Sequence, residues 1–473
     1  MSSAPPPSND QPADGGVSLG GRLAGRSLLG QVFVLAAWPL LEQILAFFVG
    51  LTDLLIAGRM GGEAQRVAVL DAMGLGVYVA WLMSILGGAV STGVMALVSR
   101  ATGARNHGLA NLGLGQGVWL GAAAGLASML VLLAGVSPLI RLLGLSGEAE
   151  AQAESYLRVL VLSAPLSGAM FSITAALRGS GDTLTPFLGM LVVNFANVGL
   201  SLLFVFAPAP LGGHGVAGIA AGTLGGWALG LLATIVLLGR GKGEGLRWER
   251  HSLRPQAAMI GRIIRVGLPQ AMEITGMWLI HAFSIRIISG LNNGGALGAH
   301  IIAIRAESMS FLPGFAIGTA AATLAGQYLG AGSRVLAAHA VKLCWALAAV
   351  MMGVMGMLFV FARHEIVALM APDSELHVRL AAPLLVVCGL SQPFFATCIV
   401  LKTAMRGTGA TGLVMRWSFG SMFFFRVVIL WTLHHLGWLD LTGVWLVMTA
   451  DMITQAVVFA RLHFRGDWLD ARV

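Results

Sequence analysis

Residues 177–183 read LRGSGDT, and residues 405–411, 228 positions later, read MRGTGAT. Two further features return at nearly the same spacing. Gly103-Ala104 is repeated 227 positions later as Gly330-Ala331, and Pro39 is repeated 230 positions later as Pro269. Three matches at nearly one offset are unexpected in a chain without internal symmetry. The repeat therefore predicts a fold built from two related halves.

Charge is scarce along the whole chain. Only 11% of the 473 residues are charged and 57% are hydrophobic, whereas a soluble domain is about 25% charged. Apolar stretches longer than about 18 residues recur from end to end, which is typical of transmembrane helices. The composition excludes a soluble enzyme, a nucleic-acid binder and a coiled coil, although the net charge is +8. The three cysteines lie in apolar runs without the paired spacing of a metal or redox motif.

Polar residues divide the apolar runs into twelve predicted spans. These cover residues 31–58, 68–98, 109–135, 153–177, 184–206, 214–239, 262–290, 296–325, 335–361, 378–404, 411–434 and 442–463. An even number of spans places both termini on the same side of the membrane.

Lys and Arg alternate between successive loops, as the positive-inside rule requires. One side carries 18 of the 29 cations, and the loops of the other side carry four, Arg59, Arg66, Arg141 and Arg363. Both termini are therefore predicted to be cytoplasmic. The 18 cations on that side are Arg22, Arg26, Arg100, Arg105, Arg178, Arg240, Lys242, Arg247, Arg250, Arg254, Arg262, Arg265, Arg334, Lys402, Arg406, Arg461, Arg465 and Arg472.

The repeat and the charge pattern divide the chain into five parts. Residues 1–27 are predicted to form a disordered cytoplasmic tail and not a cleaved signal peptide, because the first apolar run is too long. Residues 28–239 form an amino-terminal lobe (N-lobe) with spans one to six, and residues 240–261 form a cytoplasmic linker. Residues 262–464 form a carboxy-terminal lobe (C-lobe) with spans seven to twelve, and residues 465–473 form a second cytoplasmic tail.

This division predicts an all-α integral membrane protein in which two six-helix lobes are related by pseudo-two-fold symmetry. Six spans per lobe give both lobes the same orientation in the membrane. Parallel repeats of this kind form secondary transporters, in which a cavity between the lobes opens alternately to each side.

Several motifs follow one another in an order typical of one transporter family. Residues 50–58 read GLTDLLIAG, residues 178–186 read RGSGDTLTP, residues 307–314 read ESMSFLPG and residues 326–332 read GQYLGAG. With these motifs, and with Asn194 and Asn197 in the fifth span, the chain resembles the multidrug and toxic compound extrusion (MATE) transporters, in particular their NorM-like bacterial branch. The likeness covers nearly the whole chain after the tail.

The resemblance implies a secondary active antiporter that exports organic, often cationic, drugs or metabolites in exchange for H⁺ or Na⁺ by rocker-switch alternating access. It implies a plasma-membrane location, the inner membrane in a bacterium, and small organic substrates. The coupling ion is the only cofactor expected, and the protein is expected to be a monomer without enzyme activity or a nucleic-acid partner.

An alternative is a flippase of the same superfamily for lipids or lipid-linked oligosaccharides. Such a protein would need a more cationic central cavity, and Arg286, Arg305 and Arg426 keep this alternative open. Two departures also leave the coupling site open. Ser201 stands where the DinF-like branch has a second acid, and Ser391 with Gln392 stands where the NorM-like branch has an acid in the tenth span.

Carboxylates inside the spans are the candidate transport residues, since an ionisable side chain at mid-membrane costs at least about 2.5–3.5 kcal/mol. Glu42 and Asp53 lie eleven residues apart on one face of the first span, about 16 Å from each other. The resemblance makes Asp53 the acid of the first helix that helps to bind the coupling cation; the alternative is a polar residue near the outer end of the span. Asn194 and Asn197 are candidates for the same function.

Glu42 and Glu273 follow the two repeated prolines by three and four residues, so the repeat predicts that they lie at corresponding depth in the two lobes. Glu42 could equally be a packing carboxylate. In the resemblance, Glu273 matches the acid of the seventh helix that contributes to cation coupling or to binding of cationic substrate. A Na⁺ site is expected at most at Asp53 or Glu273, and no other metal site is expected.

A polar cluster around Glu273 is predicted to include His281, Arg305 and Glu307. His281 could instead be a hydrogen-bonded packing residue, and Glu307 could pair with Arg286 or Arg305.

Two further predictions concern arginines. Arg426 and Asp451 are expected to form a structural ion pair, because antiparallel spans eleven and twelve place them at similar depth. The arginines of the repeated R-G-x-G turns are expected to fix orientation at the cytoplasmic face.

Overall fold

The computed structural model of the protein describes residues 18–60, 62–142, 146–241, 245–249, 251–291, 294–372 and 374–471. In these ranges the chain is helical and contains no strand. The predicted tail up to residue 17, together with Lys242, Arg250 and Arg472, lies outside the described residues.

Twelve helices in the described part of the chain are long and apolar enough to cross a membrane, which confirms the predicted all-α membrane fold. In two spans the helix changes type part-way: a 3-10 turn at Val161–Ser163 joins α4 to α5, and a π-helical segment at Phe423–Ile429 joins α13 to α14. The N-lobe consists of α1 (Leu28–Ala57), α2 (Glu63–Gly103), α3 (His107–Leu142), α4 (Glu148–Leu160), α5 (Ala164–Ser180), α6 (Leu184–Phe206) and α7 (Gly215–Gly239). The C-lobe consists of α8 (Ala257–Ser289), α9 (Ala296–Gly330), α10 (Arg334–Phe361), the short α11 (Arg363–Met370), α12 (Glu375–Gly407), α13 (Thr411–Met422), α14 (Leu430–His435) and α15 (Leu441–Arg465).

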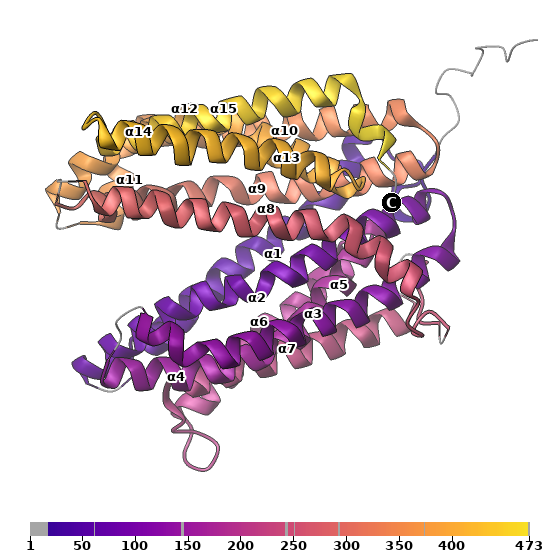
Figure 1. The fold of residues 1–473 in the computed structure, drawn as a ribbon. Helices are drawn as coiled ribbons and strands as arrows, with labels where there is room; N and C mark the ends of the chain where they lie inside the picture. Colours follow the sequence, from indigo (N-terminus) through magenta and orange to yellow (C-terminus); the bar gives the residue numbers. More distant parts are fainter. Residues whose placement is uncertain are drawn as a thin grey trace, which may run out of the picture.

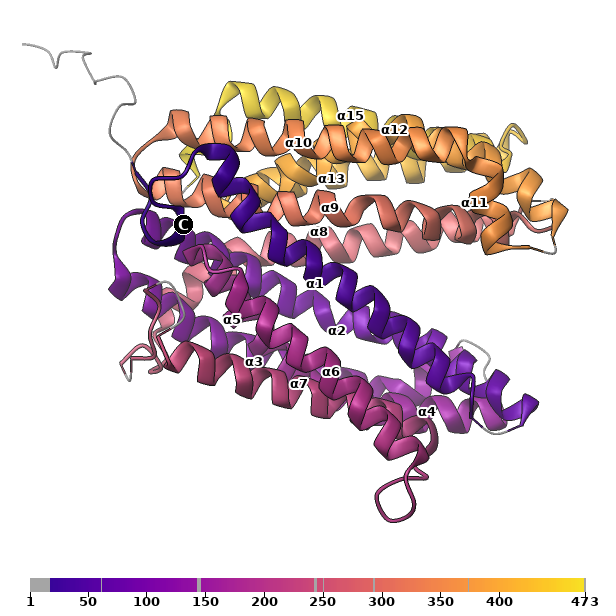
Figure 2. The ribbon, with the colours of Figure 1, turned by 180° about the vertical axis from the view of Figure 1, so that it is seen from behind.

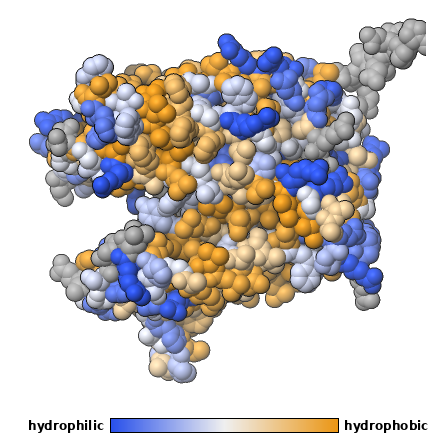
Figure 3. Space-filling model, in the orientation of Figure 1, coloured by the Kyte–Doolittle hydropathy of each residue, from blue (hydrophilic) through white to orange (hydrophobic). Residues whose placement is uncertain are grey.

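The two lobes form separate helix bundles that meet at one end and diverge toward the other (Figures 1 and 2). The end at which they meet, called the closed end below, carries the C-terminus. The surface is hollowed between the lobes at the opposite end, called the open end (Figure 3). Apolar side chains cover much of the visible outer surface, as expected for a protein that faces lipid.

Glycine allows the backbones of the two lobes to touch at the closed end. A Cβ on Gly103 of α2 would lie 1.9 Å from the carbonyl oxygen of Gln327, and one on Gly330 of α9 would lie 2.1 Å from that of Arg100. Gln327 Nε2 also donates a hydrogen bond to the Gly179 carbonyl at 2.9 Å. The repeated glycines found in the sequence are therefore the points at which α2 and α9 cross.

The repeated R-G-x-G motifs form the turns that end α5 and α12. Their second glycines, Gly181 and Gly409, have φ angles of +99° and +92°, which side chains with a Cβ rarely adopt. The first glycines serve close packing, since a Cβ on Gly407 would lie 2.5 Å from Cβ of Ala322. Asp182, which has no acidic counterpart in the second repeat, caps α6 by accepting hydrogen bonds from the amides of Leu184 and Thr185.

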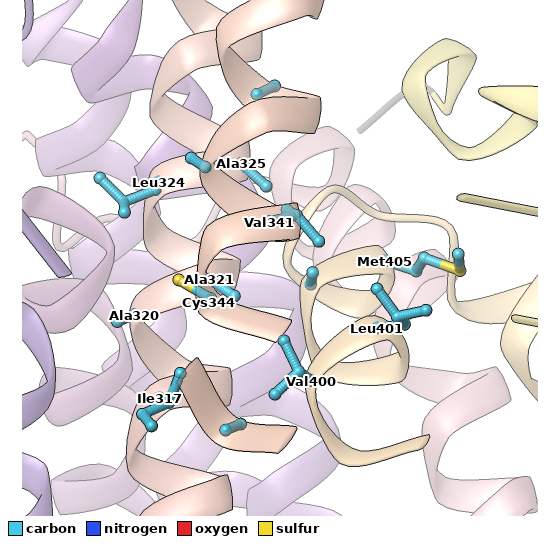
Figure 4. Packing of buried hydrophobic residues seen from close by; sticks show 14 of the residues in the cluster. Ile317, Ala320, Ala321, Leu324, Ala325, Val341, Cys344, Val400, Leu401 and Met405 are labelled. Atoms are coloured by element: carbon cyan, nitrogen blue, oxygen red, sulfur yellow. The ribbon is translucent and has the colours of Figure 1, made fainter. Parts of the chain in front are cut away.

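Small side chains form part of the C-lobe core near the closed end. Ala320, Ala321 and Ala325 of α9 are fully buried against α10 and α12, as Figure 4 shows. Membrane helices that present alanine and glycine to one another can approach closely and gain van der Waals contact. The three cysteines are buried and unbridged.

The linker between the lobes is held on α3 by two buried amide side chains. Gln116 Nε2 donates to the carbonyls of Ser252 and Arg254 at 2.7 and 2.8 Å, and its Oε1 accepts from the Gln256 amide. Asn111 Nδ2 donates to the Glu249 carboxylate, and Asn111 Oδ1 accepts a hydrogen bond from the Arg247 amide. The described part of the linker is thus ordered against the N-lobe.

Residues 18–27 precede α1 and also pack on the fold. A 3-10 turn at Gly21–Leu23 places Leu19 and Leu23 in the C-lobe core, where they are 5% and 2% exposed. The disorder predicted for the tail does not extend to these residues.

Candidate functional site

An ion pair in each lobe joins a span carboxylate to the arginine of the repeated turn. Arg178 Nη2 lies 2.5 Å from Glu42 Oε2 in the N-lobe, and Arg406 Nη2 lies 2.7 Å from Glu273 Oε1 in the C-lobe. Both arginines therefore bind carboxylates of the spans, a contact that the sequence analysis did not predict. The two glutamates do occupy equivalent places, since each pairs with the same repeat position.

The two ion pairs differ in their surroundings. Glu273 has a second cation beside it, Lys402, whose Nζ lies 3.5 Å from the same carboxylate oxygen, and the Glu273 side chain is 5% exposed. Glu42 and Arg178 are 14% and 22% exposed. The N-lobe pair is thus the more accessible one.

A cavity of about 370 Å³ lies between the lobes beside the N-lobe pair. Glu42 and Arg178 form its charged part. Its remaining lining includes residues of α2 and α5 and also Ile274 of α8 and Thr319 of α9, so both lobes contribute. The hydroxyls that line it belong to Ser84, Ser91, Thr92, Thr174 and Thr319. A cavity of this kind can hold a small molecule that carries both apolar and polar groups.

Asp53 lies further along α1 and differs from Glu42 in its pairing. Its Oδ1 is buried without a hydrogen-bond partner. A buried carboxylate oxygen without a partner is costly unless it binds a proton or a cation.

Asn194 and Asn197 lie on α6, which runs parallel to α1. Thr183 bonds the Val34 carbonyl and Trp38 contacts Phe187, and each contact joins residues 149 positions apart. If this register continues, Asp53 lies level with residue 202, between one and two turns beyond Asn197.

Both asparagines are buried, at 7% and 3% exposed. Asn194 Nδ2 and Asn197 Oδ1 lack hydrogen-bond partners, and Asn197 Nδ2 donates to Thr223 at 2.9 Å. The interior of the N-lobe therefore offers several polar atoms that the fold itself does not satisfy.

The predicted polar cluster around Glu273 is divided into two parts. Glu273 pairs with α12, whereas Glu307 and His281 lie near Arg426. In the described part of the chain, Glu307 forms no ion pair with Arg286 or Arg305, the partners considered from sequence. Its side chain interacts with that of Cys388.

His281 lies near a second histidine, His300, which was not a candidate in the sequence analysis. The centres of the two rings are 6.3 Å apart, and Trp445 Nε1 donates a hydrogen bond to His300 Nδ1 at 3.1 Å. The tryptophan fixes the tautomer of His300, because Nδ1 must then be the acceptor nitrogen.

Arg426 and Asp451 lie together, as their depths in the two spans indicated. Arg426 Nε is 2.7 Å from Asp451 Oδ2, and the other carboxylate oxygen accepts from Ser421 and Gln455. Gln455 in turn accepts a hydrogen bond from Lys402. A continuous set of polar contacts therefore joins this pair to Glu273. In the part of the chain that is described, no cluster of three His, Cys, Asp or Glu residues could hold a metal ion.

The MatE family model matches the chain twice, over residues 39–205 and 269–432. Each match begins at one of the two repeated prolines and covers most of one lobe. The chain belongs to the MatE family. As a member of that family it is a membrane transporter of small molecules and not an enzyme.

Relatives of this MatE protein are similar over nearly their full length. The "Probable multidrug resistance protein NorM" of Thermotoga maritima is 28% identical over 440 residues, 90% of each chain. A protein of the same name from Burkholderia pseudomallei is 27% identical over 457 residues, 93% of each chain. These names confirm the resemblance to the NorM-like branch.

Solved MATE structures share the fold. "Crystal structure of MATE in the bent conformation" superposes with a TM-score of 0.85 at 19% identity, covering 94% of this chain and 96% of the other. "Outward-facing conformation of a multidrug resistance MATE family transporter of the MOP superfamily" gives 0.84 at 20% identity, covering 94% and 98%.

Four residues beside the two glutamates were not candidates in the sequence analysis. Arg178, Lys402 and Arg406 were counted only as cations of one membrane side, and Thr174 was not considered. The repeat carried a usable signal: Glu42 and Glu273 are equivalent, Arg178 and Arg406 are equivalent, and a carboxylate and an arginine that recur together in both halves are candidates for a pair.

Proposed function

We propose that the protein is a secondary active antiporter that exports small organic compounds, often cationic ones, in exchange for H⁺ or Na⁺. It works as a monomer in the plasma membrane, the inner membrane in a bacterium, with both termini in the cytoplasm. The proposal is supported by the names of its relatives, which are multidrug resistance proteins. The cytoplasmic location of both termini is supported by the cation-rich segments, which lie at the closed end together with the C-terminus (Figure 1).

The observation that carries the proposal is the cavity between the lobes. It is lined by residues of both lobes, and the molecule is hollowed toward one end only (Figure 3). A site enclosed by two similar bundles that touch at one end is suited to alternating access, because rocking the lobes would close one end and open the other. With the closed end cytoplasmic, the described state faces outward.

The coupling cation is proposed to bind in the N-lobe at Asp53. Its carboxylate has an unsatisfied buried oxygen, whereas Glu42 and Glu273 already have cationic partners. A proton or Na⁺ at Asp53 would neutralise the only acid of the first helix that lacks a cationic partner among the described contacts. Asn194, Asn197 and Thr223 offer polar atoms on the neighbouring helices for rearrangement around the ion.

Exchange would follow from competition for charge in the cavity. A cationic substrate is attracted by the acids of the N-lobe, and binding of a proton or Na⁺ from outside removes that attraction. Glu307 and His281 of the C-lobe are proposed to take part only through the polar contacts around Arg426. The flippase alternative is less well supported, because the arginine in the cavity is neutralised by Glu42.

The test uses the purified full-length protein in lipid vesicles loaded with a fluorescent organic cation. A proton gradient and a Na⁺ gradient are imposed separately, and we expect one of them to drive transport of the dye. Transport that responds to neither gradient would contradict the antiporter proposal.

The Asp53→Asn variant tests the coupling residue in the same vesicles. It should retain dye binding but lose gradient-driven transport, because an amide cannot exchange a proton or balance Na⁺. Asp71→Asn, which removes an exposed acid of α2, is the matched control and should transport normally. Normal coupling in Asp53→Asn would assign the coupling ion to another acid.

A further inference from the structure

The two lobes differ at one repeat position beside the paired glutamates. The 228-residue offset that relates Arg178 to Arg406 also relates Thr174 to Lys402. Thr174 lines the cavity with Glu42 and Arg178, and its hydroxyl has no hydrogen-bond partner. The C-lobe has a cation at the same place. The lobes are therefore alike in their ion pairs and unlike in this third side chain.

Lys402 is held at Glu273 by several contacts. Its Nζ lies 3.5 Å from Glu273 Oε1 and 3.1 Å from Gln455 Oε1, and it lies 5.7 Å from the centre of the Phe459 ring. The side chain is only 16% exposed. Together, these three contacts hold the ammonium group next to the carboxylate.

Charge balance gives this contact a function. Glu273 faces two cations, Lys402 and Arg406, so that removal of Lys402 would leave this carboxylate with one. Glu42 faces one cation, Arg178, and Asp53 has no cationic partner among the described ion pairs. A free cation is thus attracted to the N-lobe and meets two fixed cations at Glu273.

We propose that Lys402 is a tethered counter-cation, held at Glu273 in place of a free cation, which excludes Na⁺ and cationic substrates from that carboxylate. The C-lobe acid then has a positioning role, and cation binding is confined to the N-lobe. The inference rests on the proposed cation-coupled transport, but its test is a binding measurement that requires no transport.

The experiment measures binding of ²²Na⁺ to the purified full-length protein in detergent, with choline replacing Na⁺ to keep the ionic strength constant. The single substitution Glu273→Gln should leave Na⁺ binding at the wild-type level. Lys402→Met should gain one bound Na⁺ per protein relative to the wild type. The double variant Lys402→Met/Glu273→Gln should lose that gain, and Lys402→Arg should behave like the wild type.

Two results would overturn the proposal. One is loss of wild-type Na⁺ binding in Glu273→Gln, and the other is a folded Lys402→Met that gains no Na⁺. Folding is checked by the unfolding temperature in Na⁺-free buffer. If Lys402→Met does not fold, Lys402→Gln, which keeps a polar group toward Gln455, replaces it with the same two outcomes. Absence of gradient-driven transport in the wild type would contradict the proposed antiporter function. It would leave the proposed role of Lys402, which is tested by Na⁺ binding, unaffected.

Discussion

At the scale of single residues, Glu273 and Asp451, two buried acids of the C-lobe, each have a cationic partner. Asp451 is fully buried and accepts hydrogen bonds from Arg426, Ser421 and Gln455. Removing one partner of a buried ion pair leaves the other charge uncompensated, at a cost of about 3–5 kcal/mol. The Arg426→Met variant should therefore lose stability by about this amount, measured as a fall in the unfolding temperature in detergent.

The double variant Arg426→Met/Asp451→Asn separates the pair from packing. It should recover much of the lost stability, because no unpaired charge remains. Arg416→Met, which removes an exposed arginine of α13, is the control and should change little. If the double variant were as unstable as the single one, the arginine would act through its packing and not through its charge.

Some residue contacts could be predicted from sequence and others could not. Arg426 and Asp451 lie in consecutive spans, so a short loop fixes their relative depth. Glu42 and Arg178 lie 136 residues apart, on helices whose relative rotation no local pattern encodes. The contact of Lys402 with Glu273 was not predicted, because a lysine near a cation-rich turn is indistinguishable, in sequence, from a loop charge. Its long stem can direct the ammonium group either way.

At the scale of helices, the crossing of α2 and α9 depends on glycine. An added methyl group at Gly103 would overlap the Gln327 carbonyl, which belongs to the backbone and cannot move alone. Such overpacking costs about 1–3 kcal/mol. Because the strain exists only where the lobes touch, Gly103→Ala should destabilise the closed end relative to a state in which the lobes separate there.

Spin labels placed on the two lobes at the closed end can measure this effect as a change in the distance distribution. Gly103→Ala should add a population with longer distances. Gly74→Ala on the same helix is the matched control, since a Cβ there meets nothing within 4 Å. Identical distributions for the two variants would show that the crossing tolerates the methyl group.

The number and order of the helices followed from hydropathy, but their internal breaks did not all do so. The 3-10 turn at Val161–Ser163 comes just before Pro165, whose missing amide interrupts the α-helical hydrogen bonds, and this break could have been expected. The π-helical segment at Phe423–Ile429 has no comparable signal, since an apolar run with Arg426 fits an α-helix equally well. The π-helical segment is defined by its backbone hydrogen bonds, which the residue composition does not indicate.

At the scale of the whole molecule, residues 18–26 connect the two lobes across the closed end. Leu23 is buried in the C-lobe core and also lies beside Gly181, which belongs to the N-lobe turn. Arg22 Nη1 lies 3.5 Å from the buried Asp182. Gln31 bonds the Leu23 carbonyl and accepts a hydrogen bond from Tyr328 of α9. The repeat has Ala410 in place of Asp182, so this attachment exists in one lobe only.

The segment should therefore oppose separation of the lobes at the closed end. Leu23→Ala removes a side chain that is 2% exposed, and a buried leucine truncated to alanine costs about 2–5 kcal/mol. Part of that cost falls only on the closed arrangement, since the contact with the N-lobe turn is lost when the lobes part. We expect a cysteine introduced at Ser180, which is 7% exposed beside this segment, to react faster with a polar thiol reagent in Leu23→Ala. Leu29→Ala, at an exposed position of α1, should leave the rate unchanged. Equal rates in both variants would mean that the segment rests on the closed end without holding it, and that Gly103 and Gly330 carry the closure alone.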